Sequence, residues 1–160
     1  MQTQLEIEIR EARVEEDLQI ARHFYQLWRD NDVPAASIKS DWQETILQFI
    51  NRARQDLFYK AFVAEVNGTV VGSASCQLFA GLYPLALTED YRKYGYIWGV
   101  YVDPPYRKRG IAKQLTSQAI AHLKSLNCTR VILHASPFGK PVYSSLGFSD
   151  SNEMHLDLLG

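Results

Sequence analysis

A basic segment that contains a glycine stands where a strand-like run gives way to a helical run. Arg107-Lys108-Arg109-Gly110-Ile111-Ala112 follows the apolar run 96–102 and the turn 103–106, and it opens a helical pattern that continues to Leu126. The first N–H groups of a helix have no partner inside it, and the helix dipole places partial positive charge there. Because Gly110 has no Cβ, a phosphate can approach the backbone closely. These residue types at this spacing therefore predict an anion-binding site.

The chain lacks two common phosphate-binding motifs. It contains neither G-x-x-x-x-G-K-[ST] nor G-x-G-x-x-G, which argues against a P-loop nucleotidase and against a dinucleotide-binding fold. Residues 107–112 instead read R-x-x-G-x-A after a strand that ends in Val-Tyr-Val-Asp-Pro. This pattern resembles the acetyl-CoA signature of the GCN5-related N-acetyltransferases, the GNAT family.

A second segment carries the same resemblance. Residues 133–148 resemble the family's later motif, in which a strand leads into a short helix with a tyrosine, here Tyr143, followed by Leu146-Gly147-Phe148. Residues 153–158 resemble its terminal strand, and the resemblance covers most of the chain from Glu8 onward. It implies an acetyl-CoA-dependent N-acetyltransferase, which moves an acetyl group to a primary amine of a small molecule or peptide by direct attack in a ternary complex.

The resemblance implies roles for residues in three segments. Backbone amides of the basic segment would bind the pyrophosphate of coenzyme A, and the main chain of the preceding strand would line the cofactor and hold the oxyanion. Tyr143 stands where many members place the general acid that protonates the departing thiolate. The implied cofactor-binding residues are Val100, Tyr101, Val102, Arg107, Lys108, Arg109, Gly110, Ile111, Ala112, Ser136 and Lys140.

Several of these positions also have a structural interpretation. The Tyr143 ring would then pack on the cofactor, with its hydroxyl only forming a hydrogen bond. Ser136 would either bind a cofactor amide or cap the following helix, and Lys140 would either reach the adenosine phosphates or stay solvated. Gly99 interrupts its strand, so it marks either a β-bulge that separates this strand from the next, as in GNAT proteins, or packing against an aromatic neighbour.

The general base and the acceptor are less well defined. No carboxylate stands on the strand before the basic segment, where many family members carry one. Glu89, Asp90 and His134 are alternative bases, and an amine that arrives deprotonated from solvent would need none. Aromatic residues suit a flat or apolar acceptor or an ammonium ion, although packing explains most such clusters. The acceptor-site candidates are Trp28, Tyr83, Glu89, Tyr96 and Trp98.

Composition narrows the class of protein. The 160 residues suit a single domain, and a net charge of −1 argues against broad binding to nucleic acid or to membrane surfaces. There is no signal-peptide pattern, and the two cysteines fall in unrelated segments, which indicates a reducing, cytoplasmic setting. The four histidines form no ligand motif, so no metal is expected. A homodimer and acyl groups longer than acetyl stay open.

Periodicity predicts the elements that position these residues. Alternation predicts a strand over 5–12, and helical spacing predicts a helix from Glu15 that ends before Pro34. A second helix fits 37–55, with Ser40-x-x-Gln43 as a capping box at or near its start. Asn67-Gly68 predicts a hairpin turn between two strands, 61–66 and 69–79.

The second half of the chain continues the alternation of strands and helices. A third helix runs to about Asn127, followed by a strand over 130–135, a short helix over 138–146 and one or two strands over 148–159. This order predicts one domain over 1–160 of the α/β (α+β) class, with a mixed, mostly antiparallel central sheet and helices on both faces. It is also the order of the GNAT fold.

A protein of another class with the same fold is the alternative. It would be a non-catalytic sensor or interaction module that binds coenzyme A or acetyl-CoA. The missing strand carboxylate favours this alternative, whereas Tyr143 favours an enzyme. Release of free thiol in the presence of amines separates the two, because a binding module would bind coenzyme A without turnover.

Overall fold

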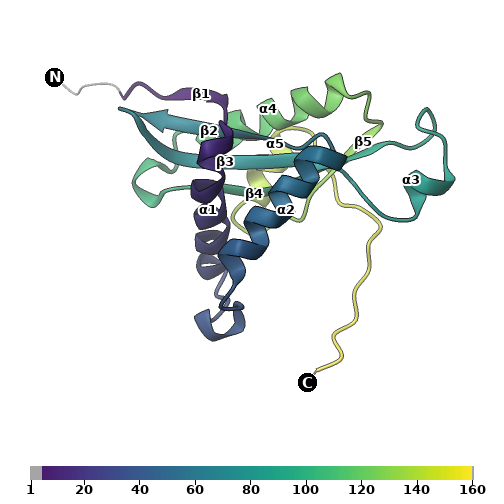
Figure 1. Ribbon diagram of the computed structural model, residues 1–160, viewed down its shortest axis with the longest axis horizontal. Coiled ribbons are helices and arrows are strands. Elements are labelled where there is room, and N and C mark those ends of the chain that lie inside the picture. The colour runs from purple at the N-terminus through teal and green to yellow at the C-terminus, as the bar shows by residue number, and fades with distance from the viewer. Residues whose placement is uncertain (1–4, 160) are drawn as a thin grey trace.

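A five-stranded sheet with helices on both faces organises residues 5–159, which the computed structural model describes (Figure 1). The strands lie in the order β1 (Glu8–Glu11), β2 (Lys60–Val66), β3 (Thr69–Leu78), β4 (Tyr94–Val102) and β5 (Arg130–Ile132). The first four are antiparallel, and β5 runs parallel to β4. The mixed, mostly antiparallel sheet predicted from the sequence is confirmed.

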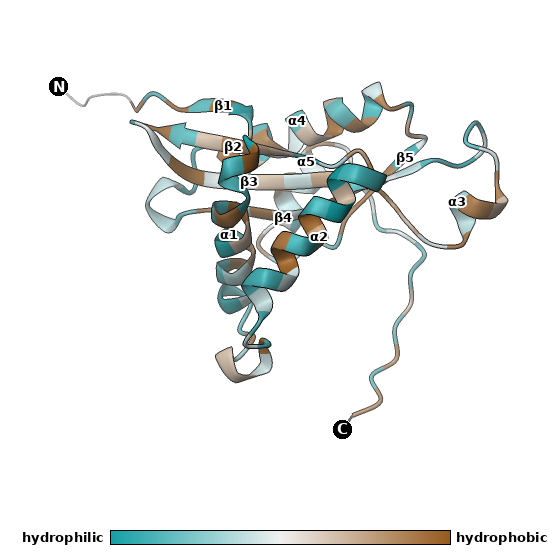
Figure 2. Ribbon diagram, viewed as in Figure 1, coloured by the Kyte–Doolittle hydropathy of each residue, from teal (hydrophilic) through white to brown (hydrophobic). Residues whose placement is uncertain are grey.

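The helices form two layers. The two long helices α1 (Asp17–Asp30) and α2 (Trp42–Asp56) cover one face, and α4 (Ile111–Ser125) covers the other (Figure 1). Figure 2 shows apolar and polar bands alternating along α2, as expected for a helix with one face against a sheet. Shorter pieces complete the fold: η1 (Val14–Glu16), η2 (Ala35–Ser37), α3 (Tyr83–Ala86), η3 (Pro104–Tyr106) and α5 (Lys140–Ser145). In the part of the chain described, no helix has the length and apolar character needed to cross a bilayer.

Each face of the sheet has its own apolar core. On the α4 side, Leu115, Ala119 and Leu123 are completely buried at helical spacing against strand residues such as Ala74. On the other side, Ile20 of α1 and Ile50 of α2 pack together over Tyr59 and Ala61. Burial of these side chains on both faces fixes the position of β3 and β4 between the layers.

Strand β3 presents a row of polar side chains to α1 and α2. Ser73, Ser75 and Gln77 are all buried, and alternate residues of the same strand face α4. Each has a partner: His23 Nδ1 lies 2.7 Å from Ser73 Oγ, the Tyr59 hydroxyl lies 2.9 Å from Ser75 Oγ, and the Trp98 indole N–H donates to Gln77 Oε1 over 3.0 Å. Buried polar groups are tolerated when they are paired in this way.

Two local predictions are confirmed by backbone geometry. Asn67 and Gly68 join β2 to β3 with φ values of 50° and 78°, as a two-residue hairpin turn of the predicted type requires. Asn127 follows α4 with φ 64°, so it ends that helix in the left-handed conformation.

The predicted start of the second helix is wrong. Helix α2 begins at Trp42 rather than at residue 37, because Ile38 is extended (φ −97°, ψ 127°) and cannot continue from η2. Asp41 is the N-cap residue and makes no side-chain capping bond, so the Ser40-x-x-Gln43 capping box does not form. Residues 35–37 instead form η2, and Ser37, Ile38 and Lys39 line a small cavity together with Tyr25 and Trp28 of α1.

The strands predicted over 148–159 are also absent. No strand is present over 149–159, and the segment runs away from the sheet (Figure 1). Its apolar side chains have no cover: Met154, Leu156 and Leu158 are 93%, 83% and 86% exposed. The alternation predicted from the sequence is real, but a strand also needs a hydrogen-bonding neighbour, and this segment has none among the described residues.

Candidate active site

A run of backbone amides without partners lies where the sequence predicts an anion site. The first hydrogen bond of α4 joins the Gln114 N–H to the Gly110 carbonyl over 3.1 Å. Among the described residues, no backbone or side-chain acceptor is bonded to the N–H groups of 108–113. Gly110 is the N-cap in the left-handed conformation (φ 78°), and a Cβ built on it would meet nothing within 4 Å. The segment is therefore open to an anion, as its sequence predicts.

The three basic side chains of the segment do not share one role. The Arg107 Nε–H donates to the Val102 carbonyl over 2.8 Å, and its guanidinium forms an ion pair with Asp30 Oδ2 at 2.7 Å. Arg107 thus ties the end of β4 to the C-terminal end of α1. Lys108 (φ 64°) and Arg109 are exposed, and they place positive charge beside the unbonded backbone amides.

A β-bulge at Gly99 interrupts the pairing of β4 with β3 beside this site. Ser75 of β3 pairs with Trp98 and Ser73 pairs with Tyr101, so three steps of β4 oppose two steps of β3. Gly99 takes φ 66°, which favours glycine. Strand β5 pairs with β4 only from Tyr94 to Tyr96 and has no register beyond it. The bulge predicted from the sequence is confirmed, whereas β5, predicted to reach residue 135, ends at Ile132, where its pairing with β4 stops.

The main chain from Val100 to Val102 lies along the side of β4 that β5 leaves uncovered. Val102 packs in the core on the α4 side, whereas the Tyr101 ring turns toward α1 and lies 5.0 Å from His23. Ile111 is buried in the α4-side core and Ala112 packs partly against it, so only the backbone N–H groups of these two residues are left open.

Tyr143 lies on α5, which packs against α4. Its ring is 5.9 Å from Phe148 and rests over Gly139, where a Cβ would come within 2.8 Å of the ring. Glycine at 139 therefore leaves the space that the tyrosine ring occupies. Burial raises the pKa of Tyr143 to about 12. The hydroxyl thus keeps its proton throughout the physiological pH range.

The residues between β5 and α5 border a cavity. The Ser136 hydroxyl accepts a hydrogen bond from the Gly139 N–H over 3.1 Å, so it caps the turn before α5 while its own hydrogen stays available to donate. Lys140 forms an exposed ion pair with Asp150 at 3.2 Å. His134 faces the same cavity, with its ring 6.0 Å from that of Tyr96.

The cavity itself has a volume of about 760 Å³ and lies on the α1 and α2 side of the sheet, next to the place where β5 separates from β4. Its walls come from the C-terminal half of α1, from α2, from β4 up to Gly99, and from 134–138. The lining residues are Phe24, Leu27, Trp28, Asp30, Asn31, Asp32, Thr45, Ile46, Phe49, Tyr96, Ile97, Trp98, Gly99, His134, Ala135, Ser136, Pro137 and Phe138.

Trp98 is the best-anchored aromatic residue of this cavity. Its indole is fixed by Gln77, and its ring makes edge contacts with Phe24 at 5.2 Å and Phe49 at 5.7 Å. Trp28 extends the same surface, 6.0 Å from Phe24. Aromatic edge-to-face packing of this kind holds the rings in defined orientations.

Three of the five predicted acceptor residues line the cavity: Trp28, Tyr96 and Trp98. The structure does not bring the other two there. Tyr83 is half exposed, with the Arg92 guanidinium 3.9 Å from its ring, and Glu89 forms an exposed ion pair with Lys93 at 3.5 Å. Phe24, Phe49 and Asp30 line the cavity without having been predicted to do so, because their helical spacing also fits an ordinary buried face.

Neither cysteine is placed as a nucleophile. Cys76 is completely buried under α4, and burial raises its pKa to about 12. Burial also raises the pKa of Cys128, which does not line the cavity. A thiol in either setting is a poor nucleophile.

Comparison with known proteins agrees with this geometry. Residues 21–148 match the family model described as the acetyltransferase (GNAT) family. A curated relative, the glucosamine 6-phosphate N-acetyltransferase of Trypanosoma brucei brucei, is 35% identical over 108 residues, which cover 67% of this chain and 70% of that relative.

Solved structures with the same fold cover nearly the whole chain. A GCN5-related N-acetyltransferase from Ralstonia eutropha JMP134 has a TM-score of 0.78 and 25% identity, over 97% of this chain and 100% of the other. A predicted acetyltransferase from Clostridium acetobutylicum, solved with acetyl-CoA, has a TM-score of 0.78 and 24% identity, over 96% of this chain and 97% of the other.

Proposed function

Because this chain belongs to the acetyltransferase (GNAT) family and is an N-acetyltransferase, we propose that it transfers an acetyl group from acetyl-CoA to the primary amine of a small molecule or peptide. The observation that carries the proposal is the run of unbonded amides over 108–113 at the start of α4. This run lies next to the end of β4, where β5 has separated from it. A diphosphate needs hydrogen-bond donors of this kind, and a thioester arm needs a gap beside the strand.

Coenzyme A would be held by backbone more than by side chains. The amides of Lys108, Arg109, Gly110, Ile111 and Ala112 would donate to the diphosphate, with the charges of Lys108 and Arg109 beside them. The main chain over 100–102 would line the pantetheine arm. Ser136 would donate its hydroxyl hydrogen to the same arm, and Lys140 would lie toward the adenosine phosphates. Arg107 would act by fixing the loop, since its guanidinium is already bonded to Val102 and Asp30.

The reaction would proceed by direct attack in a ternary complex. The amine lone pair forms the C–N bond to the thioester carbonyl carbon, a backbone N–H of β4 stabilises the oxyanion, and the C–S bond then breaks with its electron pair on sulfur. Tyr143 gives a proton to that sulfur and is reprotonated by solvent, while the amine loses one proton to water. Direct attack fits the burial of Cys76 and the position of Cys128 outside the cavity, since neither thiol is placed to form an acyl-enzyme there.

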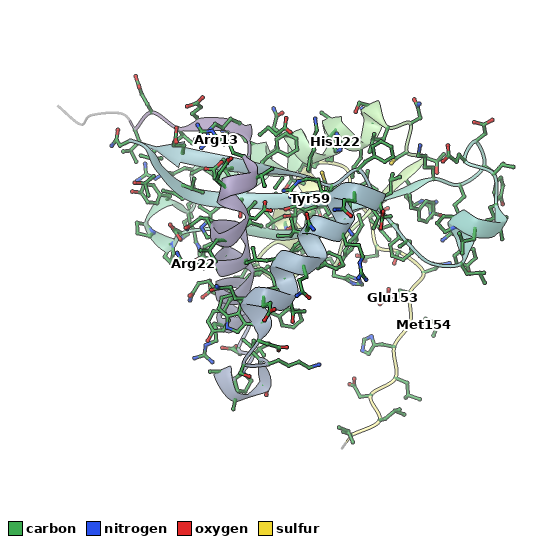
Figure 3. The ribbon with its side chains drawn as sticks, in the orientation of Figure 1. Arg13, Arg22, Tyr59, His122, Glu153 and Met154 are labelled. Carbon is green, nitrogen blue, oxygen red and sulfur yellow. The ribbon has the colours of Figure 1, made fainter. Side chains whose placement is uncertain are left out.

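The proposal includes a homodimer. Its support is the exposed segment 149–159, in which apolar Met154, Leu156 and Leu158 alternate with His155 and Asp157. The labelled residues Glu153 and Met154 lie on the C-terminal tail, which extends away from the helices and strands (Figure 3). A second copy would offer the outer edge of its β5, to which no described strand pairs.

Two measurements test the enzymatic proposal. Calorimetric titration with coenzyme A should give saturable binding, and acetyl-CoA with a panel of primary amines should release free thiol only when both substrates are present. Absence of coenzyme A binding at millimolar concentration would overturn the proposal. Binding without thiol release on any amine would instead favour a binding module.

A further inference from the structure

The acceptor end of the cavity is aromatic. Phe24 and Trp28 from α1, Phe49 from α2 and Trp98 from β4 form one continuous surface through their ring contacts. Trp28 and Phe49 are 46% and 48% exposed, which is unusual for large apolar side chains that also contact a core. Such exposed aromatic surface inside a cavity gains free energy when an apolar ligand covers it.

The charges at the cavity are negative. Asp30 and Asp32 line it, and none of the lining residues within the described range is Lys or Arg. Asp30 is bonded to Arg107, so its charge is compensated, whereas no ion pair involving the Asp32 carboxylate is found within residues 5–159. An adjoining cavity of about 310 Å³ contains Lys39, and Asp41 lines the same space. The wall near the acceptor therefore attracts a cation and repels an anion.

The enzyme proposed above thus has a cavity that does not suit a phosphorylated amino sugar. A phosphate dianion is normally held by Arg, Lys or a set of backbone amides, and the amide run over 108–113 is already assigned to coenzyme A. A polar sugar ring would also lose hydrogen bonds to water against Phe24, Phe49 and Trp98. The relative from Trypanosoma brucei brucei is named for glucosamine 6-phosphate, but the described lining of this cavity contains no Lys or Arg to bind the phosphate of that substrate.

We propose that the acceptor is a primary amine with an aromatic or otherwise apolar body, which enters as an ammonium ion past Asp32 and is not a sugar phosphate. The aromatic rings bind its body and stabilise the ammonium group by cation–π contact before deprotonation. This inference rests on the proposed acetyl transfer, because it concerns the second substrate of the same site.

The test compares an aromatic amine with an amino sugar, and that amino sugar with its 6-phosphate. 2-Phenylethylamine, glucosamine and glucosamine 6-phosphate are assayed by thiol release at saturating acetyl-CoA. We expect kcat/KM to be at least tenfold higher for 2-phenylethylamine than for glucosamine 6-phosphate, and higher for glucosamine than for its phosphate. Preference for glucosamine 6-phosphate over both other amines would overturn the inference.

Two variants connect the preference to the named residues. Trp28→Ala should raise KM for 2-phenylethylamine about tenfold. Asp32→Asn should raise it several-fold, and asparagine tolerates the left-handed φ of 65° at that position. Asp56→Asn, an exposed carboxylate at the end of α2, is the control and should change nothing. If Lys39→Ala selectively lowers turnover of glucosamine 6-phosphate, the phosphate has a site after all and the inference fails.

Binding of the acceptors to the coenzyme A complex separates this inference from the proposed function. Calorimetry with 2-phenylethylamine and glucosamine 6-phosphate ranks the two ligands even if no thiol is released. Tighter binding of the aromatic amine without turnover supports the acceptor class and contradicts catalysis. Tighter binding of the sugar phosphate contradicts the acceptor class and leaves the acetyl transfer intact.

Discussion

At the scale of single residues, Tyr143 has the features of a proton donor that remains protonated at neutral pH. Its ring contacts Phe148 and occupies the space over Gly139, where there is no Cβ, and burial raises the pKa of its hydroxyl to about 12. A phenol with this pKa is fully protonated at pH 7, although it is a weaker acid than a thiol with a pKa of about 8.5. The proton should therefore move only as negative charge develops on sulfur.

Tyr143→Phe tests this role. We expect kcat to fall by about 10²- to 10⁴-fold, while the Kd for coenzyme A, measured by calorimetry, changes little. Because the pKa lies near 12, loss of this proton should produce no fall in kcat between pH 8 and 10 in the parent enzyme. Tyr91→Phe, on a ring that is 76% exposed, is the control. A Tyr143→Phe enzyme with nearly full turnover across this range would remove the assignment.

Individual residues near the cavity and the amide run could be predicted where a motif, an interrupting glycine or a cluster of aromatic residues marked them. Gly99 and Gly110 were recognisable because glycine interrupts a strand or begins a helix there, and both have positive φ. Phe24 and Phe49 were not recognisable as cavity residues, because they follow the same helical spacing as buried residues such as Ile20 and Ile50. Tyr83 and Glu89 lie close to β4 in sequence, but their loop leads away from the cavity.

At the scale of elements, the start of α4 is the part on which the proposed binding of coenzyme A depends. Its unbonded N–H groups exist because a helix cannot satisfy its first turn, and the left-handed Gly110 directs the chain into that turn. A side-chain cap would have occupied one of these groups, and none is present at this N-cap.

Ala112→Pro removes one of these donors without breaking the helix. Proline is tolerated in the first turn, and Pro141 already occupies the second position of α5. One hydrogen bond to a charged phosphate contributes about 1.5–3 kcal/mol, so the Kd for coenzyme A should rise about tenfold to a hundredfold in calorimetry. Gln43→Pro, at the second position of α2, is the matched control and should leave the Kd unchanged. Equal weakening in both variants would mean that the effect comes from the fold and not from the missing amide.

A second set of charges joins β1 to the start of α1 and to β2. Arg10 forms hydrogen bonds to both Glu16 oxygens at 2.9 and 2.8 Å and pairs with Glu65 at 3.2 Å. Glu16 also accepts from the Arg13 N–H at 2.8 Å. The hydrogen bonds from Arg10 are the main reason that the pKa of Glu16 is lowered from 4.5 to about 2.

A lowered carboxyl pKa means that this stabilisation is complete above about pH 4.5 and is lost as the pH falls toward 2. Glu16→Gln should therefore lower the free energy of unfolding by about 2 kcal/mol at pH 7 and by much less at pH 2, measured by urea denaturation. Glu15→Gln, at the exposed neighbour, should have no effect at either pH. Equal destabilisation by Glu16→Gln at both pH values would contradict this account.

At the scale of the whole molecule, the sequence predicted the layers and the order of elements, because periodicity reports which face of each strand or helix is buried. Periodicity could not predict that the polar side chains of Ser73, Ser75 and Gln77 are buried. Their hydrogen-bond partners come from three other segments of the chain: His23, Tyr59 and Trp98. The strand predicted in the terminal segment is absent for a different reason. Its alternating pattern fits a strand, but the described part of the sheet offers it no hydrogen-bonding neighbour.

If a second copy provides that neighbour, the protein should be a dimer in solution. The double substitution Leu156→Lys and Leu158→Lys should then shift the mass measured by light scattering from two chains to one. The control is Leu82→Lys with Leu85→Lys, which changes two leucines on or next to α3 that are 73% and 85% exposed. A monomeric parent protein, or a double variant that stays dimeric, would contradict the proposed pairing.

The account as a whole depends on the amide run at the start of α4. The most direct measurement is a titration of ¹⁵N-labelled protein with coenzyme A, followed through the backbone amide resonances. We predict that the largest shifts, in the direction of stronger hydrogen bonding, fall on residues 108–113 and saturate with the calorimetric Kd. Saturable binding that leaves these resonances in place would contradict the central claim.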